Sequence, residues 1–315
     1  MKEFLKLLGW QSLVLVLILS LILRMSITLP FYGQYFSFTV VPSSDYLLFT
    51  FALMLMTASL NVICSYYDTK MADILAKTET LDNGKKLRMF WLFAIIGVAA
   101  LSYLSVKYYV WQIGALALVF ELSAYSYALK FKRMAILGNL NIAFLYALLV
   151  FMPFLLELFA FTHYQGETLL RMPASAWQIY FWLFSFFAAF VFLLTFIRDL
   201  TADLANIEEN KRDGFETFAV KYGEKRTDTL LIVLSAAFVL LNAFALFKFR
   251  YFLDTIQIGT LVIINILPFV YYVYKLLTAK RSEETVTLYQ FLGMIYISLV
   301  FTIQFTGNIF TINAN

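Results

Sequence analysis

The chain has 315 residues, of which 62% are hydrophobic and only 14% are charged, and its mean hydropathy is +0.79. A soluble domain carries about 25% charged residues, so this composition excludes a soluble enzyme and indicates a polytopic membrane protein. The net charge of +4 does not call for a nucleic-acid partner, because cytoplasmic loops of membrane proteins collect Lys and Arg. Cys64 is the only cysteine, which excludes an intrachain disulfide and a cysteine-based metal cluster.

Nine apolar stretches are long enough to cross a bilayer, which takes about 20 residues of helix. They are residues 7–29, 46–66, 87–106, 110–129, 135–160, 177–197, 229–247, 256–276 and 288–310. The sequence therefore predicts an all-α polytopic membrane protein. We expect residues 1–315 to form a single transmembrane domain of nine helices.

The Lys and Arg residues between the predicted spans indicate the orientation. If the N-terminus is cytoplasmic, most of the 24 Lys and Arg residues face the cytoplasm, and only Lys107, Arg171, Lys248 and Arg250 lie on the other side. This asymmetry predicts a cytoplasmic N-terminus. The long loops 67–86 and 198–226 then form a cytoplasmic cap, and we expect an integral protein of a bacterial inner (cytoplasmic) membrane.

The second long loop begins with spaced carboxylates directly after an apolar span. Asp199 and Asp203 are four residues apart, so a helix places them on one face, and we expect Asn206 and Asn210 to extend the same row. Oxygen ligands of this kind favour Mg²⁺, which binds through one or two carboxylates plus substrate phosphates. The row predicts a magnesium site at the cytoplasmic end of this helix.

The first long loop carries a similar but weaker pattern. Asn61, Ser65 and Asp68 can share one helical face, whereas Asp73 joins Asp68 only if the helix breaks between them. Alone, Asp68 is most simply an interfacial carboxylate solvated by water. Because Asp68 and Asp199 both follow aromatic-rich spans on the same membrane side, the parallel favours a functional role for Asp68 as well.

Basic and amide side chains stand near these carboxylates in the predicted topology. Tyr127, Lys130 and Arg133 end the fourth span and enter a short cytoplasmic turn, which also fits ordinary positive-inside anchoring. Beside an acidic metal site, fixed cations help to neutralise a diphosphate. Asn139, early in the fifth span, is either a helix–helix contact or a site residue, and Lys211 could reach a phosphate.

Ionisable residues also lie within the predicted spans. Arg24, Glu121 and Glu157 are functional or paired by default, and Arg24 and Glu121 could pair with each other or with backbone carbonyls. A small-solute transporter would explain them, but it predicts an inverted repeat with helices broken at the midplane. The polar clusters instead gather on one side of the membrane, which favours chemistry at that side.

Residues 198–223 carry a recognisable motif. Arg198-Asp199-x-x-x-Asp203 is followed by Gly214, Thr217 and Lys221-Tyr222-Gly223, and a Tyr-rich, basic exit from the fourth span leads to Asn139. The chain resembles UbiA-type intramembrane prenyltransferases, in the branch that includes geranylgeranylglycerol-phosphate synthase-like members. The resemblance implies a ring of nine helices around a central cavity. It also implies transfer of an isoprenoid chain from a polyprenyl diphosphate to a lipidic or polar acceptor among the membrane lipids.

The resemblance also implies roles for individual residues. Mg²⁺ would be held by Asp68, Asp199 and Asp203, which are also the candidate catalytic residues. The candidate substrate-binding residues are Tyr127, Lys130, Arg133, Asn139, Arg198 and Lys211.

The chain departs from the family pattern at three positions. Cys64 stands in place of an Asn, and Ala72 and Ile207 stand in place of carboxylates. These departures weaken a second metal site. They keep open an alternative function, a catalytically lapsed UbiA-like subunit or lipid-binding scaffold that assembles with partner membrane subunits.

Overall fold

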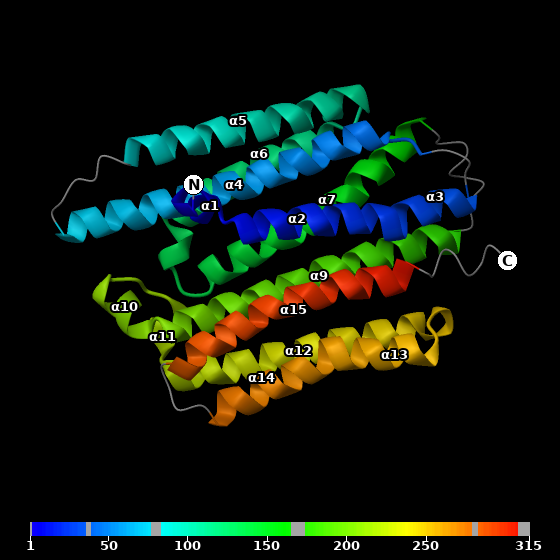
Figure 1. The fold of residues 1–315 in the computed structure, drawn as a ribbon. Helices are drawn as coiled ribbons and strands as arrows, with labels where there is room; N and C mark the ends of the chain where they lie inside the picture. Colours follow the sequence, from blue (N-terminus) through cyan, green and yellow to red (C-terminus); the bar gives the residue numbers. More distant parts are fainter. Residues whose placement is uncertain (1, 36–38, 77–82, 165–173, 279–282, 308–315) are drawn as a thin grey trace. The chain divides into compact units, whose positions relative to one another are not determined.

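A computed structural model describes residues 2–35, 39–76, 83–164, 174–278 and 283–307 (Figure 1). These ranges are almost entirely helical and contain nine helices long and apolar enough to cross a membrane. The candidate spans are Trp10–Gln34, Ser43–Asp68, Asn83–Lys107, Trp111–Leu129, Leu137–His163, Ala176–Ala205, Glu224–Phe252, Thr255–Thr278 and Thr285–Thr306. The prediction of an all-α polytopic membrane protein is confirmed.

The chain divides into two compact units, each built from separate segments. The first unit comprises Met1–Leu21, Ser37–Phe131 and Leu148–Phe181, and the second unit comprises Ile22–Phe36, Lys132–Ala147 and Trp182–Asn315. Two long helices, α7 (Leu137–Tyr164) and α9 (Ala174–Ala205), contribute residues to both units. The single nine-helix domain stays a prediction.

The first unit is organised around a long central helix. Its helices are α1 (Lys2–Leu8), α2 (Trp10–Leu23), α4 (Ser43–Ala76), α5 (Asn83–Lys107) and α6 (Trp111–Leu129). Helix α4 packs along both α5 and α6, and α5 packs on α6 (Figure 1). Gly97 permits the close approach of α5 to α4, because a Cβ there would lie 3.3 Å from Met56 Cγ.

Polar contacts also join the helices of the first unit. Ser59 Oγ on α4 lies 2.9 Å and 2.8 Å from the two carboxylate oxygens of Glu121 on α6. Near the end of the same two helices, Tyr67 Oη donates to Tyr125 Oη at 3.1 Å. The described contact of buried Glu121 is therefore with Ser59, an interaction that the sequence did not predict.

A glycine sets the bend between α1 and α2. Gly9 has φ +62°, a backbone conformation that residues other than glycine rarely adopt. The amide of Asn61 packs against this bend and donates to Leu8 O at 2.9 Å and to Ser12 Oγ at 3.1 Å. Asn61 therefore fastens the N-terminal bend to α4.

The second unit contains most of the C-terminal half of the chain. Its helices beyond α7 and α9 are η1 (Arg24–Thr28), α3 (Leu29–Tyr35), α10 (Ile207–Arg212), α11 (Phe218–Tyr222), α12 (Glu224–Phe249), η3 (Arg250–Phe252), α13 (Thr255–Leu261), η4 (Val262–Ile266), α14 (Leu267–Thr278) and α15 (Glu283–Gly307). Helix α14 packs on α12 and on α15, and α15 also contacts the π-helical segments η1 and η4. Stacked aromatic rings fill this core: the Phe238 and Phe269 ring centroids are 3.9 Å apart.

Two helices extend beyond the predicted spans into the predicted cap loops. Helix α4 continues through Ala76 and α9 continues through Ala205, so parts of segments 67–86 and 198–226 are helical. The α4 backbone does not break between Asp68 and Asp73, so the condition for these two residues to share a face is not met. The side chain of Asp73 lies outside the described residues.

Candidate active site

The Arg198-Asp199-x-x-x-Asp203 motif places two carboxylates on one face of α9, beside an amide from the start of α7. Asn139 Nδ2 donates to Asp199 Oδ2 at 2.8 Å and to Asp203 Oδ2 at 2.9 Å. Asn139 is buried, whereas both aspartates are half-buried. Asn139 therefore forms a helix–helix contact, one of its two predicted alternatives, and its role as a site residue stays a prediction.

The predicted row of oxygen ligands is wrong beyond Asp203. Helix α9 ends at Ala205, and Asn206 leaves the helical conformation with φ −107° and ψ 24°. Asn210 belongs to the separate helix α10, so it does not continue the face that carries Asp199 and Asp203. The reason is local, because Asn has a lower helix propensity than Ala or Leu and is common at helix ends.

Two connections meet beside the carboxylates. The backbone N–H of Glu216 donates to the carbonyl oxygen of Arg133 at 3.0 Å, next to an isolated β-bridge between Met134 and Glu216. The Arg133 guanidinium lies 5.4 Å from the Phe215 ring centroid. This contact fixes the segment that precedes α7 and therefore helps to set where Asn139 lies.

Two glycines of the motif adopt a left-handed backbone conformation. Gly214 has φ +72° and Gly223 has φ +82°, and each stands where a short helix ends. A residue with a Cβ would be strained in this conformation. The two glycines therefore bound the segment that contains α11.

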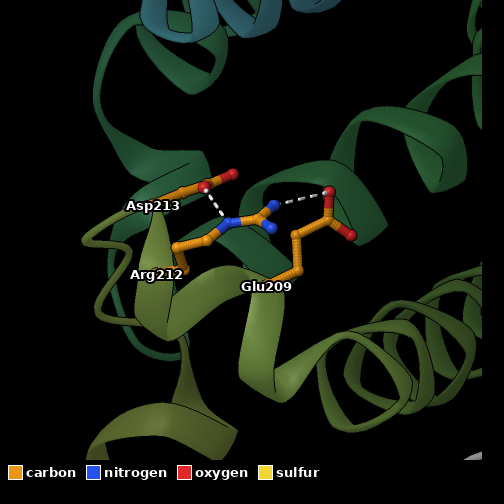
Figure 2. Close-up of polar contacts among 3 residues, drawn as sticks. All are labelled: Glu209, Arg212 and Asp213. Carbon is orange, nitrogen blue, oxygen red and sulfur yellow. Dashed lines mark hydrogen bonds and ion pairs between the residues drawn. The ribbon is translucent and has the colours of Figure 1, made fainter. Parts of the chain in front are cut away.

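The cations of α10 are engaged locally. Lys211 Nζ lies 2.8 Å from Glu208 Oε1. Figure 2 shows Arg212 between two acids, with Nη2 3.8 Å from Glu209 Oε1 and Nε 3.3 Å from Asp213 Oδ1. Lys211 is thus paired with Glu208, and its predicted role in binding a diphosphate stays a prediction.

Three predicted site residues belong to the first unit. Asp68 is exposed on α4, Tyr127 is buried near the end of α6, and Lys130 is exposed directly after α6. The hydrogen bonds described above between predicted site residues are those of Asn139 with Asp199 and Asp203. The roles of Asp68, Tyr127 and Lys130 stay predictions.

Arg198 has partners that the motif did not indicate. Its Nη2 donates to the hydroxyl of Tyr289 on α15 at 2.8 Å, and the guanidinium carbon lies 4.5 Å from the Tyr289 ring centroid and 5.9 Å from that of Tyr296. The sequence analysis missed both tyrosines because, in an apolar span, they look like packing residues. Their seven-residue spacing, which places both on one helical face, was the available signal.

The carboxylate pair fits a Mg²⁺ ion shared with a substrate. The Asp199 and Asp203 oxygens converge on one point, marked by Asn139 Nδ2, and the charge of Lys132 acts on both carboxylates. Within the described ranges, no three His, Cys, Asp or Glu side chains gather closely enough to form a metal cage. Such a site suits Mg²⁺, which is commonly held by one or two carboxylates together with substrate phosphates.

Known proteins are similar in sequence to this chain over most of its length. The chain is 25% identical over 256 residues to digeranylgeranylglyceryl phosphate synthase of Methanobrevibacter smithii, covering 77% of this chain and 81% of that protein. It is 22% identical to the protein of the same name from Methanosphaera stadtmanae, covering 80% and 84%.

Solved structures share the fold over almost the full length. One, from a study of digeranylgeranylglyceryl phosphate synthase in membranes, has a TM-score of 0.60 at 19% identity and covers 98% of both chains. Another, a UbiA homologue from Archaeoglobus fulgidus bound to DMAPP and Mg²⁺, has a TM-score of 0.56 at 15% identity and covers 96% of this chain and 98% of that chain. The UbiA prenyltransferase family itself matches residues 31–299. The chain therefore belongs to the UbiA prenyltransferase family, whose members are intramembrane prenyltransferases.

Proposed function

We propose that this protein transfers an isoprenoid chain from a polyprenyl diphosphate to a hydroxyl group of a lipidic acceptor, with the help of Mg²⁺. The observation that carries the proposal is the Asp199–Asn139–Asp203 contact, which gathers two carboxylates at the end of a membrane helix. The product named in the matched relatives makes geranylgeranyl diphosphate the first donor to test. For the same reason, geranylgeranylglyceryl phosphate is the first acceptor.

The reaction breaks one bond and forms another. The bond between C1 of the prenyl chain and the diphosphate oxygen breaks, and the diphosphate leaves with the electron pair. The acceptor oxygen then forms a bond to C1 and loses its proton, so diphosphate and a proton are the co-products.

The side chains of the site stabilise the charge that develops on the diphosphate. Asp199 and Asp203 would hold Mg²⁺, with Asp68 as a further predicted ligand, and bound Mg²⁺ supplies electrostatic stabilisation of the leaving diphosphate. Arg198 and Lys132 add fixed positive charge beside the carboxylates, and Lys130, Arg133 and Lys211 are further candidate cations. Tyr127 and Asn139 remain the candidate uncharged contacts to the substrate.

We further propose that the site faces the cytoplasm. The support is the distribution of Lys and Arg, which concentrates on the side that carries the motif. A bacterial inner membrane remains the predicted location of this integral membrane protein. The donor diphosphate would then reach the site from the cytoplasmic surface.

The test measures diphosphate release and product formation by the purified protein in lipid nanodiscs, with the two named substrates and Mg²⁺. We expect EDTA to abolish turnover. The double substitution Asp199→Asn/Asp203→Asn should lower turnover by more than about 100-fold, which exceeds the loss typical when a residue that only supports a metal ligand is replaced. Asp213→Asn changes a carboxylate on the same loop and should leave turnover unchanged.

Two outcomes would contradict the proposal. Turnover that survives the double substitution would exclude these aspartates as the site. A wild-type protein that binds no diphosphate in the presence of Mg²⁺, and that co-purifies with a partner chain, would instead support the lapsed subunit. The support for this second function, a catalytically lapsed subunit, is the set of departures from the family pattern at Cys64, Ala72 and Ile207.

A further inference from the structure

We propose that Tyr289 and Tyr296 of α15 are positioning residues for Arg198. They orient its guanidinium without neutralising its charge, as a carboxylate partner would, so that Arg198 can bind the donor's diphosphate. The inference rests on the proposed function. It assigns a task to α15, a helix outside the Arg-Asp-x-x-x-Asp motif. It also explains how the cation of that motif is held at the end of an apolar helix.

The contacts to Arg198 come from one face of α15. Tyr289, Gly293 and Tyr296 are four and three residues apart, so a helix places them in one row. Tyr289 accepts a hydrogen bond from Arg198 Nη2 at 2.8 Å, and its ring centroid lies 4.5 Å from the guanidinium carbon. The row fixes the guanidinium by one hydrogen bond and by two aromatic rings.

The glycine of this row leaves space at the guanidinium. A Cβ built at Gly293 would lie 3.9 Å from Arg198 Nε, which is ordinary van der Waals contact. A longer side chain at this position would therefore extend toward the guanidinium. Glycine keeps the surroundings of Nε clear of a competing group.

Tyr296 is itself held in place by α9. Its hydroxyl lies 2.5 Å from Thr195 Oγ1, and both residues are buried. Thr195 stands one helical turn before Arg198 on the same helix. The ring beneath the guanidinium is therefore anchored to the helix that carries the cation.

This mode of holding an arginine keeps its charge available. A carboxylate partner would neutralise the positive charge of the guanidinium. A tyrosine hydroxyl and aromatic rings orient the guanidinium but carry no negative charge, so its positive charge is retained. Within the described residues, Arg198 forms no ion pair with a carboxylate, and its buried Nε has no hydrogen-bond partner. A guanidinium has five N–H donors, so most of them remain for an anion such as a diphosphate.

A purely structural link between α9 and α15 is the competing explanation. That link would affect folding but not the affinity for a small anion. The two explanations therefore differ in a binding measurement that needs no turnover. Inorganic diphosphate, with Mg²⁺ present, is the probe.

The experiment compares Tyr289→Phe and Tyr289→Leu with the wild-type protein in nanodiscs. We expect Tyr289→Phe, which removes only the hydrogen bond, to weaken diphosphate binding by about 3- to 10-fold, and Tyr289→Leu, which also removes the ring, by about 10- to 100-fold. The KM for the donor should rise in parallel, with a smaller change in kcat. Tyr274→Phe, a matched change at an exposed tyrosine of α14, should change neither.

A double substitution separates positioning from folding. In an Arg198→Gln background, Tyr289→Phe should cause no further loss of diphosphate affinity, because the group that it positions is absent. An equal loss in both backgrounds would overturn the inference. So would a lower melting temperature with unchanged diphosphate affinity, or a wild-type protein that binds no diphosphate.

The same measurements distinguish failure of the proposed function. If Tyr289 controls diphosphate binding but no prenyl product forms with any donor and acceptor, the positioning role stands and the proposed reaction fails. If product forms and the Tyr289 variants bind diphosphate like the wild type, the reaction stands and the positioning role fails.

Discussion

Asn139 shows how one side chain organises two like charges. Its amide contacts Asp199 and Asp203 at once, and carboxylates this close repel each other unless a donor or cation stands between them. The sequence predicts the aspartate pair, because four-residue spacing on a helix is a local property. It does not predict which of the two possible roles Asn139 takes, because that depends on how α7 packs beside α9.

Replacing this amide should make stability depend on Mg²⁺. Hydrogen bonds to charged groups contribute about 1.5–3 kcal/mol, so Asn139→Leu should lower the melting temperature in EDTA by several degrees. Added Mg²⁺ should then raise the melting temperature of the variant more than that of the wild type. Thermal unfolding with and without Mg²⁺ checks this, with Asn206→Ala as the control at an exposed asparagine. Equal Mg²⁺ increments in variant and wild type would contradict it.

At Gly9, both the backbone conformation and the packing predict that a larger residue destabilises the protein. Gly9→Ala forces a residue with a Cβ to φ +62° and places that Cβ 2.5 Å from Asn61 Nδ2. The conformation alone costs about 1–2 kcal/mol, so the melting temperature should fall by a few degrees. Gly259→Ala is the control, since a Cβ there meets nothing within 4 Å and the residue is helical. Identical melting temperatures for the two variants would refute the steric argument.

Among the elements, the spans are predictable and their ends are not. In the part of the chain that the structure describes, the long apolar stretches form nine helices, because backbone groups in lipid must bond within the segment. Helices α4 and α9 nevertheless continue past the apolar residues, and α9 ends at Ala205, just before Asn206, a residue type of low helix propensity. Polar helix ends carry no hydrophobic signal, so composition places the boundaries only within several residues.

The contact between the segment before α7 and the turn after α10 depends on one backbone donor. Glu216→Pro removes the N–H that bonds Arg133 O and should shift the segment that leads to Asn139. A misplacement of about 1 Å can cost up to about 100-fold in rate, so we expect turnover to fall by about 10- to 100-fold. Glu216→Ala keeps the N–H and should retain most turnover. If both variants have the same turnover, the backbone bond does not position the site.

For the whole molecule, the uneven distribution of Lys and Arg between the two sides predicts the orientation of the chain in the membrane, which can be tested. In a Cys64→Ala background, the variants Glu209→Cys and Tyr251→Cys each provide one exposed thiol, on opposite sides of the predicted membrane. A membrane-impermeant maleimide added to intact cells should label Tyr251→Cys, and should label Glu209→Cys only after lysis. The reversed pattern would show that the motif faces outward.

The limits of sequence reasoning are also clear for the whole molecule. Hydropathy and Lys/Arg counts predict the class and an orientation, because both depend on composition. The tyrosines that contact Arg198 lie more than 90 residues further along the chain. Their role depends on the packing of α15 against α9, which no local pattern specifies.

The position of the Asn139 nitrogen has a consequence for the order of binding. Mg²⁺ held by Asp199 and Asp203 would compete with the Asn139 amide for the Oδ2 atoms of the two carboxylates. A lone cation gains little from that exchange, whereas a cation that arrives with diphosphate brings additional oxygen ligands. Cation and diphosphate should therefore raise each other's affinity by the same factor, which titrating each in the presence and absence of the other would measure.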